Sequence, residues 1–439
     1  MRKSFLSTRT ALSLVLSFIL PLQMLATELG EAGKRLAALP GVSNVETLES
    51  AHFPEKYVFF IRQQLDAKDA SKGDFDQRVV LCHRGFDRPT VFVTEGYNGR
   101  YALYNNYIEE LAKLFDTNII LAEYRYFDKS MPKERNWDYL TVENSLYDLH
   151  HINETLRTMY NGKWISTGIS KGGQTTMFYR SYFPDDVDIS VPYVAPLNRA
   201  LEDVRPEVFI NDKVSTKENR QKVIDFQTLL FERKAALMPL MEEYCKEMKY
   251  TFKEPLENVF DFCVLEYSFA FWQWGYNVDR IPTREATDEQ LFGYLMGISE
   301  PSYFTNQTGN VSFNVQAARE LGYYGYYTQP FKKYLSIKTS KGYLKRLMLP
   351  TDAEDIKFSS ELYKHTVSFL SKNDPKMIYI YGEQDPWTAT GIYGLPLTKD
   401  KENLHVYLCK GGSHYTRIKS FPEETQQEII QLINKWLQE

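Results

Sequence analysis

The chain has 439 residues, enough for one large domain with an inserted segment. Apolar residues make up 43% and charged residues 25%, a balance that is typical of globular proteins and argues against disorder. The net charge of -5 provides no basic surface, so we expect neither nucleic acid nor an anionic membrane surface as a partner.

The first 26 residues have the layout of a secretory signal peptide. Three basic residues precede the apolar residues 11–20, and small residues follow at 26–27. This apolar run is shorter than the ~20 residues that span a bilayer, and no later stretch is long and apolar enough to do so. We therefore expect residues 1–26 to be removed, and the mature protein to be exported to the periplasm or the extracellular space without membrane insertion.

The chain has four cysteines, and none of them forms a Cys-x-x-Cys pair, which gives little support to structural zinc or thiol redox chemistry. In an exported protein Cys245 and Cys263, which lie in one local segment, could form a disulfide. Four buried thiols are the alternative, and the sequence leaves both open. The motifs His-Glu-x-x-His, Walker loop and G-x-G-x-x-G after a strand are absent, so we expect no metal and no cofactor.

Six apolar segments predict strands of a sheet that is covered on both faces, because they show little alternation of polar and apolar residues. They lie at residues 90–94, 118–122, 164–167, 189–194, 377–381 and 404–408. Helical periodicity is found between and after them, most clearly in residues 141–160 and 429–437. Strands that alternate with helices predict an α/β fold with a mostly parallel sheet.

This alternation stops after the fourth predicted strand and resumes at the fifth. The intervening residues, among them 223–231 and 236–248, predict helices joined by aromatic-rich loops. An insertion of this size between two sheet strands is most simply a cap. We predict a largely helical cap at residues 200–350, with the core formed by residues 27–199 and 351–439.

The strongest local motif is Gly168-Ile169-Ser170-Lys171-Gly172, which follows a predicted strand and precedes a helical run. This strand–turn–helix context is typical of a G-x-S-x-G nucleophile elbow, in which the glycines let strand and helix approach closely. We predict that Ser170 is a nucleophile and that the backbone N–H of Lys171 points at the oxyanion position. An ordinary turn is the alternative.

A serine hydroxyl needs a base, and α/β-hydrolases supply it in the chain order Ser, Asp or Glu, His. Asp385 lies in the loop after the fifth predicted strand, and His414 lies in a glycine-rich loop after the sixth. The carboxyl ends of parallel strands deliver catalytic side chains. We predict that Asp385 orients His414 and that His414 acts as base and then as acid. Glu383 is an alternative acid, whereas Asp374 precedes its strand and lies at the wrong end of the sheet.

The second oxyanion donor should come from the loop after an earlier strand. Residues 94–99, Thr-Glu-Gly-Tyr-Asn-Gly, follow the first predicted strand and permit close approach of the backbone. We predict the N–H of Tyr97 or Gly96 as this donor. A plain turn between strand and helix is the alternative.

Taken together, Gly-Ile-Ser-Lys-Gly-Gly, Thr-Glu-Gly-Tyr-Asn, Gly-Glu-Gln-Asp-Pro-Trp-Thr-Ala and Gly-Gly-Ser-His resemble the motifs of the secreted bacterial tripeptidyl aminopeptidases, also called prolyl tri/tetrapeptidyl aminopeptidases. The resemblance runs from about residue 55 to the end. It implies an α/β-hydrolase fold with Ser170, Asp385 and His414 as the catalytic triad. It also implies release of short peptides from free N-termini, often after proline.

An aminopeptidase needs a partly desolvated carboxylate to bind the α-ammonium group of its substrate. Glu123 and Glu95 are the candidates. The segment Glu123-Tyr124-Arg125 departs from the family pattern, which has histidine in the second place, so the resemblance supports a substrate role there less firmly.

Two other enzyme classes use the same triad. One is an esterase or lipase with a lipid-facing cap, which the charges at 232–234 and elsewhere in the cap disfavour. The other is a dipeptidyl or carboxypeptidase-like serine exopeptidase. A binding protein on an inactive hydrolase scaffold is disfavoured by the complete set of motifs. Peptides are the expected substrates, and the sequence does not give the oligomeric state.

Overall fold

The computed structural model describes residues 28–305 and 310–439. The predicted signal peptide, residues 1–26, lies outside this part of the chain. Within the described residues, none of the helices combines the length and the apolar character that crossing a membrane requires.

A nine-stranded sheet forms the frame of the described part, in the order β1-β2-β3-β5-β4-β6-β7-β10-β11. Its strands are β1 (Val42–Thr47), β2 (Glu55–Gln64), β3 (Asp74–His83), β4 (Thr90–Thr94), β5 (Asn118–Ala122), β6 (Trp164–Ile169), β7 (Ile189–Tyr193), β10 (Met377–Gly382) and β11 (Leu404–Cys409). The first three strands are antiparallel to their neighbours, and the remaining six are parallel to one another. The parallel six are the strands predicted from the sequence, which confirms that prediction.

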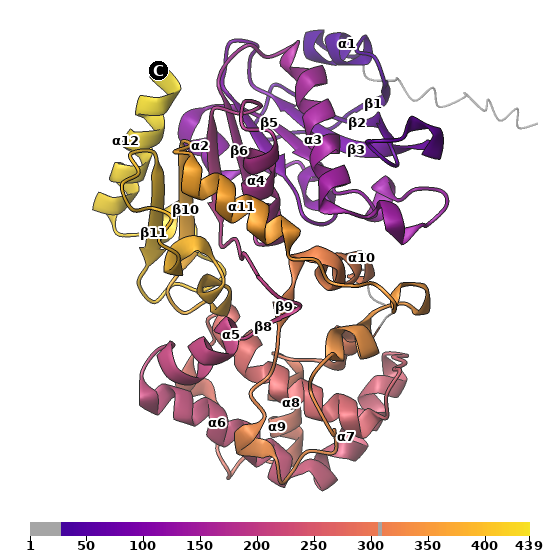
Figure 1. The fold of residues 1–439 in the computed structure, drawn as a ribbon, viewed down its shortest axis with the longest axis vertical. Coiled ribbons are helices and arrows are strands. Elements are labelled where there is room, and N and C mark those ends of the chain that lie inside the picture. The colour runs from indigo at the N-terminus through magenta and orange to yellow at the C-terminus, as the bar shows by residue number, and fades with distance from the viewer. Residues whose placement is uncertain (1–27, 306–309) are drawn as a thin grey trace, which may run out of the picture.

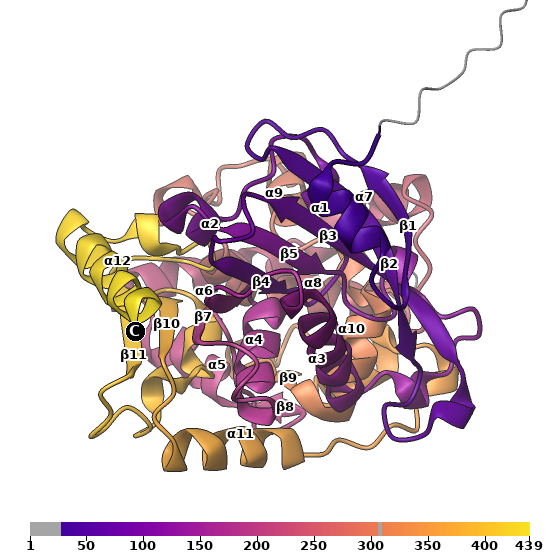
Figure 2. The ribbon, with the colours of Figure 1, turned by 90° about the horizontal axis from the view of Figure 1, so that it is seen from above.

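Helices cover both faces of the sheet (Figure 2). One face carries α1 (Glu31–Ala37), α3 (Val142–Arg157), α4 (Lys171–Tyr182) and α11 (Glu361–Lys372), and the other carries α2 (Glu110–Phe115) and α12 (Glu423–Gln438). Neighbouring strand residues alternate between these layers, so Phe92 packs on the first face while Val91 and Val93 pack on the second. This strand order, with a serine turn between β6 and α4, is the α/β-hydrolase fold.

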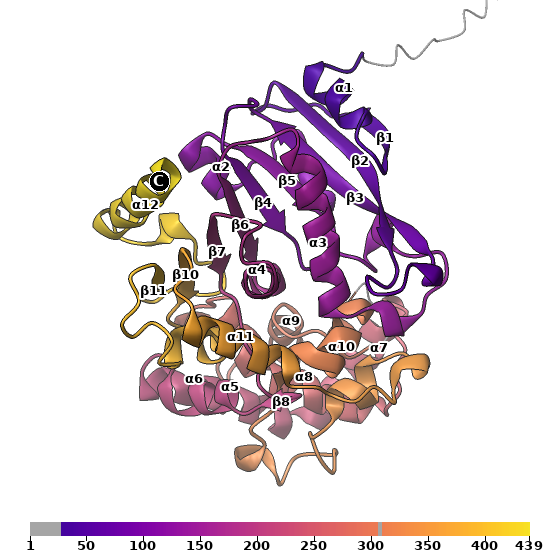
Figure 3. The same cartoon turned by 45° about the horizontal axis from the view of Figure 1, so that its top comes forward.

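A largely helical insert leaves the sheet after β7 and returns before β10, as predicted. Its main helices are α5 (Arg205–Val208), α6 (Lys217–Glu232), α7 (Lys234–Glu247), α8 (Leu256–Gln273), α9 (Asp288–Met296) and α10 (Val311–Gln316). In Figure 1, α5 to α9 lie in the lower half of the molecule and α10 lies at mid-height, between them and the core, and Figure 3 shows the insert below the sheet. A two-stranded parallel pair, β8 (Glu202–Asp203) and β9 (Tyr323–Tyr324), lies where the insert meets the core. The exact limits of 200–350 stay a prediction.

All four cysteines are buried free thiols. Cys245 lies on α7 and Cys263 on α8, and burial raises the pKa of the Cys245 thiol to about 11. Of the two alternatives that the sequence leaves open, the structure contains the unpaired thiols.

Candidate active site

Ser170 occupies a strained turn between β6 and α4. Its φ of 58° and ψ of -118° lie outside the regions that most side chains adopt, and its N–H donates a hydrogen bond of 2.9 Å to the Tyr193 carbonyl. The turn is tight because Gly168 has no side chain: a Cβ there would lie 2.4 Å from the carbonyl of Gly172 and 2.8 Å from that of Thr94. This is the conformation expected of a nucleophile elbow.

His414 and Asp385 form a buried pair. Nδ1 of the imidazole lies 2.6 Å from Oδ2 of the carboxylate, and the two side chains are 4% and 0% exposed. The second oxygen, Oδ1, accepts a hydrogen bond of 3.1 Å from the N–H of Trp387. Because the carboxylate bonds to Nδ1, it favours the tautomer whose Nε2 can accept a proton.

The insert helps to hold His414 in place. The backbone N–H of His414 donates a 2.8 Å hydrogen bond to the carbonyl of Gln273, at the end of α8. The Trp274 ring meets the imidazole edge to face, with centroids 5.6 Å apart and an interplanar angle of 86°. The loop that carries the imidazole is therefore fixed by core and insert together.

The other two acids considered from the sequence have different partners. Glu383 accepts a hydrogen bond of 2.8 Å from the N–H of Gly411. Asp374 accepts from the N–H groups of Glu402 and Asn403, ahead of β11, and so lies at the opposite end of the sheet. Asp385 is therefore the acid that contacts His414.

Ser170 and His414 line one cavity of about 520 Å³ between the core and the insert. Its wall is rich in aromatic side chains. Core loops contribute Tyr97, Trp387 and Tyr415, and the insert contributes Trp274, Phe313 and Tyr323. A space of this size, lined by aromatic rings and by polar side chains, suits a short peptide.

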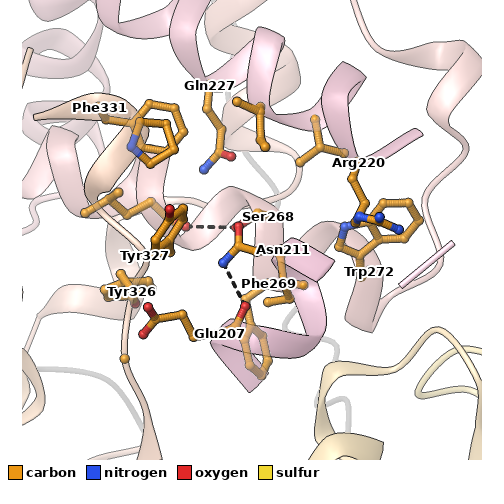
Figure 4. Close-up of a pocket in the computed structure, with 16 residues that line it drawn as sticks. Glu207, Asn211, Arg220, Gln227, Ser268, Phe269, Trp272, Tyr326, Tyr327 and Phe331 are labelled. Carbon is orange, nitrogen blue, oxygen red and sulfur yellow. Dashed lines mark hydrogen bonds between the residues drawn. The ribbon is translucent and has the colours of Figure 1, made fainter. Parts of the chain in front are cut away.

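A second space inside the insert is far smaller (Figure 4). It encloses about 30 Å³ between α6, α8 and the segment 325–331, with Trp272 and Tyr326 in its wall. That volume holds a single water molecule. The cavity beside Ser170 is the candidate substrate site, because both Ser170 and His414 line it.

The predicted oxyanion donors face different surroundings. Lys171 is the first residue of α4, whose N-terminal N–H groups have no partner within the helix and carry partial positive charge. By contrast, the N–H groups of Gly96 and Tyr97 donate to Oε1 of Glu95, at 2.9 and 3.3 Å. An oxyanion can use either of these two donors only after the Glu95 carboxylate moves.

The two predicted anchors for the substrate amine differ in location. Glu95 lines the cavity and is half-buried, and its Oε2 accepts a 2.5 Å hydrogen bond from the Tyr101 hydroxyl. Glu123 is fully buried, forms an ion pair with Arg78, accepts from the N–H of Gly99 and does not line the cavity. Its oxygens already have partners, so the structure does not favour Glu123 as an anchor.

A buried carboxylate that the sequence did not single out lies behind the cavity wall. Glu266 on α8 accepts hydrogen bonds from the hydroxyls of Tyr324, at 2.9 Å, and Tyr326, at 2.7 Å. Burial raises the pKa of Glu266 from 4.5 to about 7. Tyr324 lines the cavity, which links this acid to the site.

Several lining residues of the insert were also not predicted from the sequence. They are Gln273, Trp274, Tyr303, Phe313, Tyr323 and Tyr324. The run Tyr323-Tyr324-Gly325-Tyr326-Tyr327 is a compositional signal of an aromatic wall. Its position against Ser170 depends on how the insert folds back, which local sequence does not encode.

Comparison with known proteins assigns the family. The family model described as PS-10 peptidase S37 matches residues 29–430. The prolyl tri/tetrapeptidyl aminopeptidase of Streptomyces mobaraensis is 27% identical over 416 residues, which cover 92% of this chain and 84% of that protein.

Solved structures that resemble the chain are more distant. Proline iminopeptidase of Mycobacterium smegmatis has a TM-score of 0.42 at 13% identity and covers 90% of this chain and 99% of its own. The peroxisomal α/β-hydrolase Lpx1 of Saccharomyces cerevisiae has a TM-score of 0.40 at 13% identity, with 87% and 88% covered. The family model spans most of the sequence, so the chain belongs to the peptidase S37 (PS-10) family of serine peptidases.

Proposed function

We propose that the protein is a serine exopeptidase that releases short peptides, tripeptides above all, from free N-termini and favours proline at the cleavage site. One observation carries the proposal: the strained Ser170 and His414, which is paired with the buried Asp385, line one cavity between the core and the insert. The name of the Streptomyces relative supports the substrate class.

In the proposed reaction His414 Nε2 takes the proton of the Ser170 hydroxyl as its oxygen attacks the scissile carbonyl. The tetrahedral intermediate collapses when His414 gives that proton to the leaving amine, which departs as the shortened peptide. A water molecule, deprotonated by His414, then attacks the acyl-enzyme. His414 returns this proton to the Ser170 oxygen as the bond between that oxygen and the acyl group breaks, and the acid released is the short N-terminal peptide. Asp385 stays ionised throughout and stabilises the imidazolium.

The negative charge on the intermediate would be stabilised by the Lys171 N–H at the start of α4 and by a second N–H, of Tyr97 or Gly96. Glu95 holds both of these loop N–H groups in the resting enzyme. We propose that its carboxylate turns toward the α-ammonium group of a bound peptide, which frees the loop for the oxyanion. A carboxylate left beside the oxyanion would oppose its formation by charge repulsion.

The position of the cavity between the core and the insert supports cleavage near a chain end. The insert contributes Trp274, Phe313 and Tyr323 to the wall of the cavity that Ser170 lines, and these side chains limit the length of peptide that fits there. Aromatic walls also suit the compact, apolar ring of proline. We also propose that residues 1–26 are a signal peptide that directs export of the protein, and N-terminal sequencing of the secreted protein would test this.

Three substrates test the proposed function: a free-amine Xaa-Xaa-Pro anilide, its N-acetylated form and a nitrophenyl ester. We expect rapid turnover of the first, at least about tenfold slower turnover of the second, and complete loss of both in Ser170→Ala. Turnover of the ester alone would instead indicate an esterase. Covalent labelling of Ser170 by a fluorophosphonate, absent in Ser170→Ala, separates either enzyme from an inactive scaffold.

A further inference from the structure

The side chain of Lys171, the residue after the proposed nucleophile, is buried beside the cavity and reaches the loop after β4. Lys171 is only 2% exposed, and its Nζ donates a 2.5 Å hydrogen bond to the carbonyl of Gly96. Among the described residues no carboxylate forms an ion pair with this ammonium group; Glu95 and Glu320 act on it only at longer range. The Lys171 side chain is thus buried, and its hydrogen-bond acceptor is a neutral carbonyl.

Aromatic rings surround the ammonium group. Nζ lies 3.3 Å from the ring centroid of Tyr124, 5.3 Å from that of Phe127 and 5.6 Å from that of Tyr97. Burial lowers the pKa of Lys171 well below its ordinary value, and the ring faces compensate part of the lost hydration. We call Tyr97, Tyr124 and Phe127 the lysine cage.

The bond to Gly96 acts on the loop that carries the second proposed oxyanion donor. The carbonyl of Gly96 and the N–H of Tyr97 belong to one planar peptide unit, so they point in opposite directions. Because Lys171 Nζ holds the Gly96 carbonyl in one direction, it also sets the direction of the Tyr97 N–H. The approach is close, since a Cβ on Gly96 would lie 2.7 Å from the Cβ of Lys171.

We propose that Lys171 is a positioning residue that holds the Tyr97 N–H in the direction an oxyanion needs, in addition to the backbone N–H that Lys171 itself presents. The inference rests on the proposed function, in which the Tyr97 N–H is a donor. One side chain then ties the start of α4 to the loop after β4, so the two donors keep a fixed separation.

The insert supports the lysine cage from the other side. On α10, Gln316 Nε2 donates a 3.0 Å hydrogen bond to the Tyr124 hydroxyl, and the Phe313 ring packs on Tyr97 with centroids 5.7 Å apart. The backbone N–H of Tyr124 also donates a hydrogen bond of 3.1 Å to the Tyr97 carbonyl, which links two residues of the lysine cage directly. The geometry of the oxyanion loop thereby depends on the seating of the insert.

Lys171→Met tests the proposal, because methionine keeps the length of the side chain and removes its donors. We expect kcat to fall about 10²-fold, as when one oxyanion donor is lost, with KM changed by less than about threefold. Affinity for the aldehyde analogue of the best tripeptide, whose adduct with Ser170 carries the oxyanion, should fall in parallel. Affinity for the free product tripeptide should stay unchanged, and Lys171→Arg should restore part of kcat.

Lys56→Met is the matched control. Lys56 is also buried, donates 2.7 Å to the carbonyl of Tyr104 and lies over the Tyr107 ring, but it does not line the cavity. The Lys56→Met variant should have a lower midpoint of thermal unfolding than the wild type and the same kcat. Should Lys171→Met not fold, Tyr124→Leu, which removes the ring below the ammonium, carries the same test with a smaller expected loss of kcat.

Equal losses of product affinity and aldehyde affinity in Lys171→Met, or an unchanged kcat, would overturn the positioning role. The same result in Tyr124→Leu would do so if that variant replaces it. Failure of the proposed function looks different, because the wild-type enzyme would then not cleave the free-amine anilide at all, whatever residue stands at position 171.

Discussion

Nδ1 of His414 lies 2.6 Å from Oδ2 of Asp385, although the two residues stand 29 positions apart on different loops. The register of β10 and β11 explains this closeness. The strands are parallel neighbours that pair from Met377 with Leu404 to Gly382 with Cys409, so they end together and their loops leave the same edge of the sheet. The strand order therefore brings the two side chains together, and both of them are buried where they meet.

Replacing Asp385 tests this contact. We expect Asp385→Asn to lower kcat by about 10³- to 10⁴-fold, because an amide favours the wrong imidazole tautomer. Glu383→Gln is the control, since Glu383 bonds the N–H of Gly411, and it should keep nearly full activity. Peptide anilide kinetics on both variants check this. Loss of activity in the Glu383 variant alone would reassign the triad acid.

Gly168 should be the least replaceable glycine of the elbow. In Gly168→Ala the new methyl group would lie 2.4 Å from the carbonyl of Gly172, so we expect a loss of about 2–3 kcal/mol of unfolding free energy. Gly293→Ala, in the exposed part of α9 with nothing near the added carbon, should gain about 0.5–1 kcal/mol. Urea unfolding measures both. An elbow variant as stable as the wild type would show that the turn can relax.

Glu266 should make stability depend on pH. Its pKa is raised from 4.5 in the unfolded chain to about 7 in the fold, so the fold favours the protonated acid. The stabilisation is complete below pH 4.5 and is lost as the pH rises through 7, by about 3 kcal/mol. Glu266→Gln stays neutral and escapes this loss.

Urea unfolding of wild type and Glu266→Gln at pH 5 and pH 8 checks this prediction. We expect similar stabilities at pH 5, and a variant more stable by about 2–3 kcal/mol at pH 8. The comparison cancels the contributions of Glu109 and Glu320, two partly buried acids whose pKa values desolvation also raises to about 7. A difference that does not change with pH would mean that Glu266 does not titrate in this range.

Substitution of Glu95 and of Glu123, the two predicted anchors for the substrate amine, should have different effects. In Glu95→Gln we expect KM for a free-amine tripeptide anilide to rise about 10- to 100-fold, the worth of one hydrogen bond to a charged group, with no change for the N-acetylated substrate.

Glu123→Gln should instead lower unfolding free energy by about 2–3 kcal/mol, because it leaves the buried Arg78 with fewer acceptors. It should not alter the preference for free amines. If it did, and Glu95→Gln did not, the anchor would be Glu123 after a rearrangement of its ion pair.

Local sequence predicted the parallel half of the fold well and the antiparallel half not at all. A strand that is buried on both faces has a continuous apolar sequence, and this signal predicted all six parallel strands of the sheet. β1, β2 and β3 carry polar residues, such as Arg62 and Asp76, on positions that face solvent, so they lack that signal. The insert was predicted from the interruption of strand–helix alternation.

The sequence by itself determined the elbow, its glycines and the order of Ser170, Asp385 and His414, because these depend on short motifs that follow strands. Only the tertiary structure decided which acid touches the imidazole, that Glu95 and not Glu123 borders the cavity, and that Lys171 braces the loop of Tyr97. Burial and distance between segments far apart in the chain are properties of packing, and no local pattern of residues records them.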